Sequence, residues 1–124
     1  MLGNNDAIVT IPVRKVGAAK HFYEGKLALT PVRSEEPSVL LYKSGNSLIL
    51  VYESKFAGTN QATAVSWVVD DVEGVVRDLK AKGIAFEHYD FPGTTRQGDV
   101  HVAGSRKNAW FKDPDGNILA VVSR

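Results

Sequence analysis

The chain repeats one order of elements, and this repeat limits the fold more than any other feature of the sequence. Residues 7–13 are apolar and β-branched, which is typical of a strand, and residues 16–29 carry apolar side chains near the 3.6-residue period of a helix. The same order returns with a strand-like segment at residues 64–69 and a helical pattern at residues 72–79. Because neither half can bury its sheet alone, the repeat predicts an α+β fold in which two similar modules pair and enclose a concave surface.

Turn-forming residues divide each half further. The first helix is expected to end near Gly25, and the second to begin after an N-cap at Asp70-Asp71 and to have Gly83 as its C′ residue. Ser44-Gly45-Asn46 predicts a hairpin. Residues 90–106 exceed the usual length of a loop, so they form either a functional flap or, in part, a strand with no clear pattern. Short strands are expected at residues 29–33, 39–43, 47–53 and 84–89.

The C-terminal segment predicts a second hairpin. Asp113-Pro114-Asp115-Gly116-Asn117 combines a fixed φ, a side chain that can bond its own backbone, and residues that tolerate positive φ. Residues 109–111 and 118–122 on either side are apolar and rich in β-branched or aromatic side chains. We expect this hairpin to lie in the core.

Composition narrows the class of protein. A chain of 124 residues is expected to form a single domain, residues 1–124, with a core that needs no metal or disulfide support. A formal charge of +1 provides no broad basic field for nucleic acid, and the absence of cysteine excludes thiolate chemistry. No apolar stretch reaches membrane-spanning length, and the first ten residues lack the features of a signal peptide. We therefore expect a cytoplasmic protein that binds neither nucleic acid nor membrane.

Three segments together resemble the vicinal oxygen chelate superfamily, which includes glyoxalases, bleomycin-resistance proteins, fosfomycin-resistance enzymes and extradiol dioxygenases. They are AAKHFYEGKLAL at residues 18–29, VVDDVEGVVRDLKAKGIAFE at residues 68–87, and AWFKDPDGNIL at residues 109–119. The resemblance implies two βαβββ modules, at about residues 7–54 and 62–124, that form a cup-shaped mixed sheet with the helices on its convex side. It also implies a homodimer. Because one fold of this kind hosts many chemistries, the function depends on the residues of the site.

Enzymes of this family hold a divalent metal at the floor of the cup, and the resemblance places their ligand positions on aliphatic residues in this chain. The family uses a His or Gln in the first strand, a Glu in the fourth, a His or Gln in the fifth and a Glu in the last. The corresponding residues are Ile8, Leu50, Ala64 and Ala120. Their side chains carry no nitrogen or oxygen donor for a divalent ion. We therefore expect no metal and no cofactor.

The same register and the alternation of strand side chains predict the lining of the cup. It is apolar, with a few hydroxyl groups, and Trp110 lies on its wall whereas Phe111 packs under the helices. Such a lining suits a small aromatic or amphipathic ligand; the plainer alternative is a filled core without a cavity. The predicted ligand-binding residues are Thr10, Leu48, Leu50, Tyr52, Ala64, Ser66, Trp110 and Ala120.

These inferences predict a metal-free protein of the glyoxalase or bleomycin-resistance type that sequesters a small molecule. The alternative is a glyoxalase-like lyase, isomerase or dioxygenase that uses relocated metal ligands or an acid–base pair of His101 and Glu87. With Asp99, these two residues are also a conceivable metal site. A third possibility is a structural homodimer with a collapsed cup.

Other polar residues are weaker indications of a functional site. His21 and His88 are expected at the surface, on a helix and a strand respectively. Arg96, Arg106 and Lys107 form a sparse basic patch around the long segment. This patch either meets an anionic group of a ligand or is solvated surface charge, the latter being the plainer interpretation.

Overall fold

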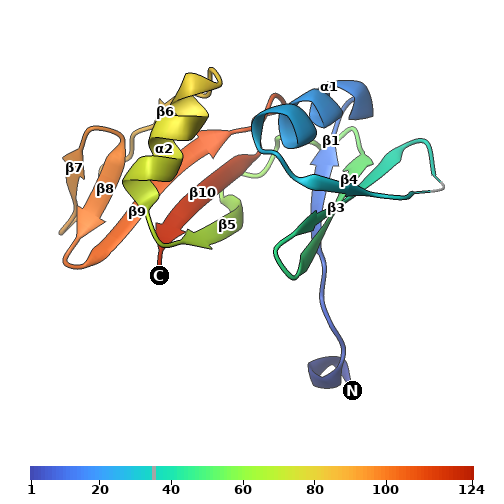
Figure 1. The fold of residues 1–124 in the computed structure, drawn as a ribbon, viewed down its shortest axis with the longest axis horizontal. Helices are drawn as coiled ribbons and strands as arrows, with labels where there is room; N and C mark the ends of the chain where they lie inside the picture. The colour runs from blue at the N-terminus through green and yellow to red at the C-terminus, as the bar shows by residue number, and fades with distance from the viewer. Residues whose placement is uncertain (35) are drawn as a thin grey trace. The chain divides into compact units, whose positions relative to one another are not determined.

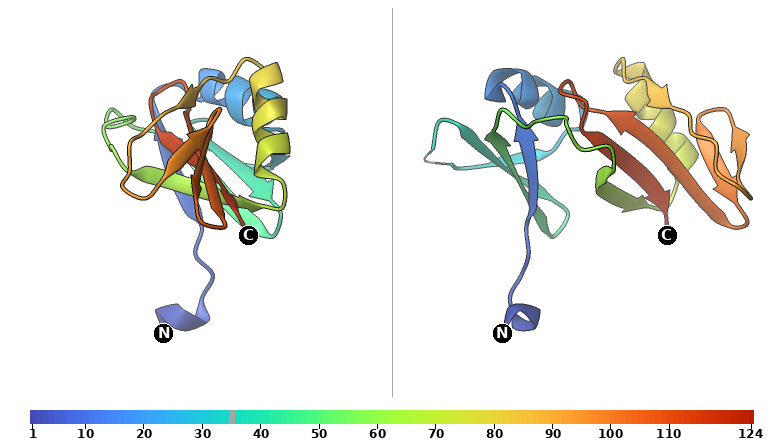
Figure 2. Two further views of the ribbon diagram at one scale, coloured as in Figure 1. Left: turned by 90° about the vertical axis from the view of Figure 1, so that its left-hand side faces the viewer. Right: turned by 180° about the vertical axis from the view of Figure 1, so that it is seen from behind.

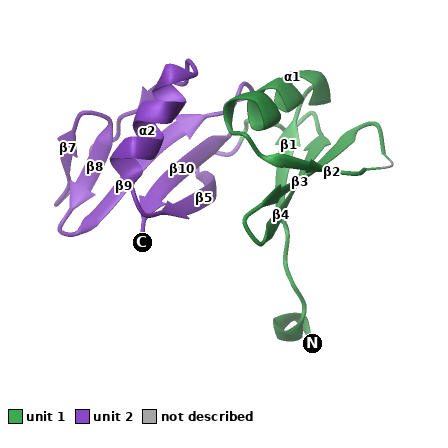
Figure 3. Cartoon of the chain, viewed as in Figure 1, with its two compact units in different colours: residues 1–59 green, residues 60–124 purple. Residues whose placement is uncertain are grey.

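The computed structural model describes residues 1–34 and 36–124 and divides the chain into two compact units, residues 1–59 and 60–124 (Figure 3). Each unit contains a mixed sheet with a helix on one face, as Figure 1 shows. The boundary lies within the polar segment 55–61, where turn-forming residues separate the two runs of strands.

Unit 1 is a βαβββ module. Its four-stranded sheet has the order β1-β4-β3-β2, with β1 parallel to β4 and the other pairs antiparallel. The residues that precede β1 extend away from this sheet in every view (Figures 1 and 2). The elements are η1 (Leu2–Asn4), β1 (Val9–Val13), α1 (Val16–Lys20), the π-helical turn η2 (His21–Lys26), β2 (Thr30–Val32), β3 (Val39–Ser44) and β4 (Ser47–Glu53).

Unit 2 repeats the module with one interruption. Its six-stranded sheet has the path β5-β10-β9-β8-β7, and β6 also pairs with β9. The module has one strand directly after its helix, and in unit 2 this strand is divided into β6 and β8, which both pair with β9. The segment between β6 and β8 contains β7. The elements are β5 (Thr63–Val69), α2 (Val72–Ala81), β6 (Phe86–Glu87), β7 (Thr95–Gln97), β8 (Val100–Ala103), β9 (Arg106–Lys112) and β10 (Ile118–Ser123).

These two modules confirm the predicted α+β fold and the internal repeat. The strand predicted at residues 47–53 is β4 to the residue, and Gly45, with φ of 57°, lies in the turn between β3 and β4. The carboxylate of Asp71 caps α2 by accepting a hydrogen bond of 3.0 Å from the Gly74 amide. Gly83, with φ of 88°, follows the C-cap residue Lys82. The sequence therefore defined both ends of the longer helix correctly.

Several strand boundaries differ from the predictions by a few residues. The strand expected at residues 84–89 is reduced to Phe86–Glu87, because the chain leaves the sheet after two paired residues. The long segment 90–106 contains β7, β8 and the first residue of β9, so the predicted alternative of a partly strand-forming segment is correct. The first helix ends in a π-helical turn at Lys26, one residue beyond the predicted end near Gly25. Ala28, with φ of 58°, takes the left-handed position that glycine usually occupies at a helix end.

The core of unit 1 lies between its sheet and the α1–η2 helix. Tyr23 on η2 stacks on Tyr42 of β3 with ring centroids 6.4 Å apart, and Phe22 meets Tyr23 edge-on at 5.1 Å. The Tyr42 hydroxyl donates a hydrogen bond of 2.8 Å to Glu24 Oε2. Other buried residues on this face are Ile11, Val13, Ile49 and Val51. Among residues 1–34 and 36–59, no helix covers the opposite face of the sheet.

The core of unit 2 lies under α2, which packs against β8, β9 and β10. Phe111 is 1% exposed and contacts Trp67 at 6.5 Å and Phe86 at 5.5 Å between ring centroids. The predicted hairpin between β9 and β10 is confirmed, and buried Asp113 organises its turn. Its carboxylate accepts hydrogen bonds from the backbone amides of Asp115 and Asn117 and from the Asn117 side chain. This hairpin fixes which side chains of β9 and β10 reach each face of the sheet.

Candidate functional site

The candidate site lies on the face of the unit 2 sheet that α2 does not cover. Strand pairing aligns Trp110 on β9 with Ala120 on β10, and Ala120 with Ser66 on β5. Because side chains alternate along a strand, these three residues share one face, while Phe111 points into the core beneath α2. The predicted division between Trp110 and Phe111 is therefore present in the structure.

An aromatic cluster surrounds Trp110 on this face; we call it the Trp110 cluster, and it consists of Tyr89, Phe91, His101 and Trp110. The indole of Trp110 contacts each of the other three rings, with centroid distances of 5.4 Å to Tyr89, 5.5 Å to Phe91 and 4.9 Å to His101. Its Nε1–H donates a hydrogen bond of 3.2 Å to Thr63 Oγ1. Phe91 remains 48% exposed. The cluster thus fixes the indole and leaves an aromatic surface accessible.

Two hollows lie beside the Trp110 cluster, and Phe91 and Trp110 line both of them. One, the Arg106 hollow, has a volume of about 290 Å³, and the other, the Ile118 hollow, of about 310 Å³. The residues around the Arg106 hollow are Phe91, Thr94, His101, Ala103, Arg106, Asn108 and Trp110. Those around the Ile118 hollow are Gln61, Ala62, Thr63, Tyr89, Phe91, Trp110 and Ile118.

His101 is 2% exposed and pairs with Asn108 across β8 and β9. Its Nε2 accepts a hydrogen bond of 3.0 Å from the Tyr89 backbone amide, so the proton of the neutral ring is on Nδ1. In the described part of the chain this buried Nδ1 has no hydrogen-bond partner, and neither has the buried Tyr89 hydroxyl. Buried polar groups are nearly always paired, and an unpaired one costs roughly 1–3 kcal/mol. The cluster therefore contains two polar groups that a ligand or solvent would satisfy.

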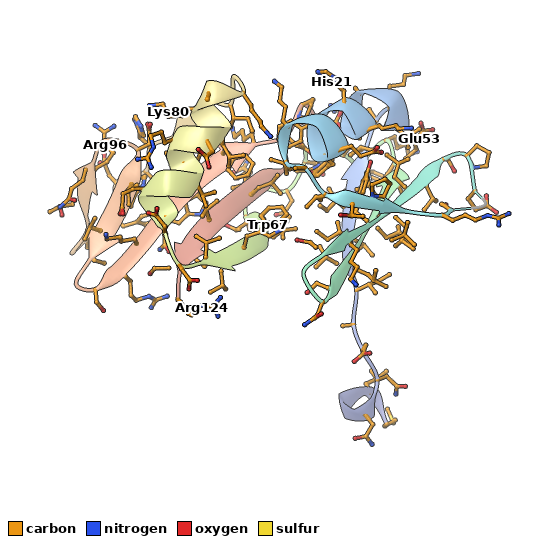
Figure 4. All side chains as sticks on the ribbon, in the orientation of Figure 1. His21, Glu53, Trp67, Lys80, Arg96 and Arg124 are labelled. Carbon is orange, nitrogen blue, oxygen red and sulfur yellow. The ribbon has the colours of Figure 1, made fainter. Side chains whose placement is uncertain are left out.

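A network of charges lies at the edge of the same unit. Asp99 accepts hydrogen bonds from Lys80 Nζ at 2.6 Å and from His88 Nε2 at 2.7 Å, while Arg96 contacts the other ring nitrogen of His88. Lys80 and His88 stabilise the carboxylate and lower the pKa of Asp99 below its usual value. Figure 4 labels the Lys80 and Arg96 side chains, which reach this network from α2 and β7. The network ties the β7–β8 hairpin to the helix.

The structure does not form the proposed acid–base pair. Glu87 pairs with Trp110 across β6 and β9, and its Oε1 lies 3.5 Å from Lys112 Nζ. No hydrogen bond joins Glu87 to His101 within residues 1–34 and 36–124. Asp99 is held by Lys80 and His88, and no group of three or more His, Asp or Glu side chains in this part of the chain could hold a metal ion. The conceivable site of Glu87, His101 and Asp99 is therefore not formed.

The four positions at which the family carries metal ligands do not fit a metal either. Leu50 lies on β4, Ala64 on β5 and Ala120 on β10, while Ile8 directly precedes β1. These side chains are hydrocarbon, so they offer a divalent ion no donor. We therefore derive no chemical step through a metal.

The predicted ligand-binding residues fall into two groups. Thr10, Leu48, Leu50 and Tyr52 lie on the helix-free face of the unit 1 sheet, where Thr10 pairs with Leu50. Ser66, Trp110 and Ala120 lie together on the corresponding face of unit 2. Ala64 falls at a register shift, because the partner of Ile118 is Thr63 and that of Leu119 is Val65. Ala64 therefore has no partner on β10.

Sequence reasoning did not identify Tyr89, Phe91 or Asn108 as site residues. Phe91 follows a segment of polar residues and precedes Pro92-Gly93, a context that predicts a turn and gives no indication of a packed ring. The one feature of the sequence that could have identified Phe91 as a site residue was an aromatic side chain in a segment expected to be a loop. Of the predicted basic patch, Arg106 lines a hollow, while Lys107 pairs with Glu73 at 2.7 Å.

The repeated βαβββ module, with a helix on one face and a free opposite face, is the fold of the vicinal oxygen chelate superfamily. The sequence profile of the Glyoxalase/Bleomycin resistance protein/Dioxygenase superfamily matches residues 7–121, and the chain belongs to this family. None of the curated proteins compared with the chain matches it. The helices described here are all too short or too polar to cross a membrane.

Solved structures confirm the fold at low sequence identity. A glyoxalase family protein from Enterococcus faecalis is 22% identical, with a TM-score of 0.73 over 98% of this chain and 99% of that one. A lactoylglutathione lyase from Agrobacterium tumefaciens is 16% identical, with a TM-score of 0.71 over 97% and 93%. The fosfomycin resistance protein FosX from Listeria monocytogenes is 12% identical, with a TM-score of 0.73 over 98% and 93%. At these identities the similarity shows the fold alone.

Proposed function

We propose that this chain is a metal-free small-molecule binding protein of the glyoxalase/bleomycin-resistance type, which takes an aromatic or amphipathic ligand beside Trp110. The observation that carries the proposal is the Trp110 cluster with its two adjoining hollows. Ligand sites are concave and mostly apolar, with a few polar groups that orient the ligand. The cluster offers aromatic surface from Phe91 and Trp110, and polar groups from His101 and Asn108.

In unit 1 we propose a separate apolar surface for ligand, on the face of the sheet opposite α1 and η2. Leu48 is 38% exposed there, and Leu50 and Tyr52 are half-buried, so the face presents apolar surface with one phenol. Apolar surface of this kind often marks an interaction site. We also propose a homodimer, which the family resemblance supports and which light scattering after gel filtration would test.

The enzymatic alternative has less support. General acid–base catalysis needs a proton carrier within hydrogen-bond reach of its partner or substrate. The Nε2 of His101 is occupied by the Tyr89 amide, and Glu87 lies beside Lys112. The aliphatic side chains at the family's ligand positions offer nothing to a metal-dependent lyase or dioxygenase.

Tryptophan fluorescence tests the binding proposal directly, because the chain has two tryptophans, Trp67 and Trp110. The variant Trp67→Phe leaves Trp110 as the sole reporter, while Trp110→Phe leaves Trp67, which stacks on Phe111 in the core. Titration of the chelator-dialysed protein with aromatic acids, aromatic amides and aromatic antibiotics should produce saturable quenching in Trp67→Phe. The same ligands should raise the melting temperature, since a ligand that binds the folded state stabilises it.

Two results would contradict the proposal. If no compound changes Trp110 emission or the melting temperature, the Trp110 cluster is packing and does not form a ligand site. If the purified protein retains a stoichiometric metal after dialysis and binds ligand only with it, the metal-free part of the proposal is wrong.

A further inference from the structure

We propose that the Arg106 hollow is a site for a planar aromatic monocarboxylate, whose ring lies against Phe91 and Trp110 and whose carboxylate is bound by Arg106. This inference rests on the proposed function and adds the chemical class of the ligand. It follows from the charge of the residues that line the hollow, from their unpaired hydrogen-bond donors, and from the rings and the volume of the hollow.

The residues that line the Arg106 hollow carry positive charge and no negative charge. Arg106 is the cationic residue among them, and no Asp or Glu contributes to the lining. The nearby acids are already engaged, since Asp99 is bound by Lys80 and His88, and Glu87 faces Lys112. Arg106 itself pairs with no carboxylate in the described residues. An anion entering the hollow would therefore meet the guanidinium of Arg106 and no carboxylate among the lining residues.

The neutral polar groups of the hollow add hydrogen-bond donors. His101 is almost fully buried, and its protonated Nδ1 has no partner in the part of the chain that the structure describes. The side chains of Thr94 and Asn108 likewise form no side-chain hydrogen bond within residues 1–34 and 36–124. Because these donors have no acceptor in the protein, they favour a ligand with several acceptor oxygens. A carboxylate is such a group, and its two oxygens can accept two parallel hydrogen bonds from the guanidinium of an arginine.

The rings and the volume define the rest of the ligand. Phe91 and Trp110 lie 5.5 Å apart between centroids, with an angle of 50° between their planes, and both border the hollow. The two rings are already in contact with each other, so a ligand ring would pack against the surfaces that they turn to the hollow. Aromatic rings prefer the edge-to-face or offset contacts that such surfaces offer, which favours a flat ring over an aliphatic chain. A volume of about 290 Å³ is at the lower limit of small-molecule sites, which suits one ring or two fused rings.

The test uses 2-naphthoate and its neutral isostere 2-naphthamide, titrated calorimetrically into the full-length protein. We expect 2-naphthoate to bind about tenfold more tightly than the amide, because only the carboxylate can form the charged pair with Arg106. Arg106→Gln should weaken 2-naphthoate about fivefold to twentyfold and leave the amide unchanged. Arg77→Gln, which removes another exposed arginine, on α2, is the matched control and should change neither affinity.

Asn108→Leu provides a second variant that removes a donor without a change of net charge, and we expect about a threefold loss for 2-naphthoate. Equal affinity for acid and amide, or an Arg106→Gln protein that binds the acid as the parent does, would overturn the carboxylate assignment and leave the aromatic binding proposal intact. If neither probe binds, while neutral aromatics also leave Trp110 emission unchanged, both proposals are wrong.

Discussion

Replacement of Asp113 by alanine tests how the hairpin turn holds unit 2 together. Asp113 is 5% exposed, and its carboxylate accepts hydrogen bonds at 3.0 Å from the Asp115 amide, 2.9 Å from the Asn117 amide and 2.8 Å from Asn117 Nδ2. At about 1 kcal/mol for each bond, Asp113→Ala should lower the free energy of unfolding by about 3 kcal/mol. Because the turn sets the register of β9 and β10, the loss should destabilise the whole sheet of the unit.

Urea unfolding followed by tryptophan emission is the appropriate assay, since both Trp67 and Trp110 lie in unit 2. The transition midpoint should fall with an unchanged m-value, and the melting temperature should fall by roughly 10 °C. Asp113→Asn keeps an oxygen for the two backbone amides but turns an NH₂ group toward Asn117 Nδ2, so it should cost about half as much. Asp90→Ala removes an exposed carboxylate and is the control. A cost below about 1 kcal/mol for Asp113→Ala would refute the assignment of the turn to this carboxylate.

Three further predictions concern stability. Ala28→Gly should raise the melting temperature by roughly 2–5 °C in a circular dichroism melt, because Ala28 adopts a left-handed φ of 58° that glycine tolerates without strain; a fall would contradict it. Tyr42→Phe should cost about 1 kcal/mol in urea unfolding by removing the hydrogen bond to Glu24, and Glu24→Gln, which keeps an acceptor, should cost less. The pKa of Asp99 is lowered in the folded state, so the stabilisation by its charge is present above the unfolded value of 3.8 and is lost as the pH falls through the folded value. Asp99→Asn should therefore flatten the decline of the urea midpoint below about pH 4, and an unchanged decline would count against the network with Lys80.

Local chemistry was sufficient for the regular parts of the fold. The helix over residues 72–81 follows from its apolar period, and the cap Asp71 and the glycine Gly83 act within one turn of its ends. The strand at residues 47–53 was predicted to the residue because turn-forming side chains border it on one side. The end of the first helix was predicted to within one residue, near Gly25, although Ala28 and not a glycine takes the left-handed position.

The interrupted strand of unit 2 could not be inferred from pattern. All three residues of β7 are exposed, so the strand has no buried face and no alternation to detect. In β8, Val100 and His101 are adjacent and both buried, because α2 contacts one face of the sheet and the aromatic cluster the other. Burial on both faces removes the period of two on which strand prediction depends.

By itself, the sequence determined the repeated module, the hairpin turn at Asp113 and the side of β9 on which Trp110 lies, because each depends on residues that are neighbours along the chain. It also determined that hydrocarbon side chains occupy the family's metal positions. Only the tertiary structure decided that His101 is buried with an unpaired Nδ1 and that Tyr89 and Phe91 pack on Trp110. These contacts join β8 and β9 to the segment that follows β6. The path of that segment depends on long-range packing, which produces no periodic pattern in the sequence.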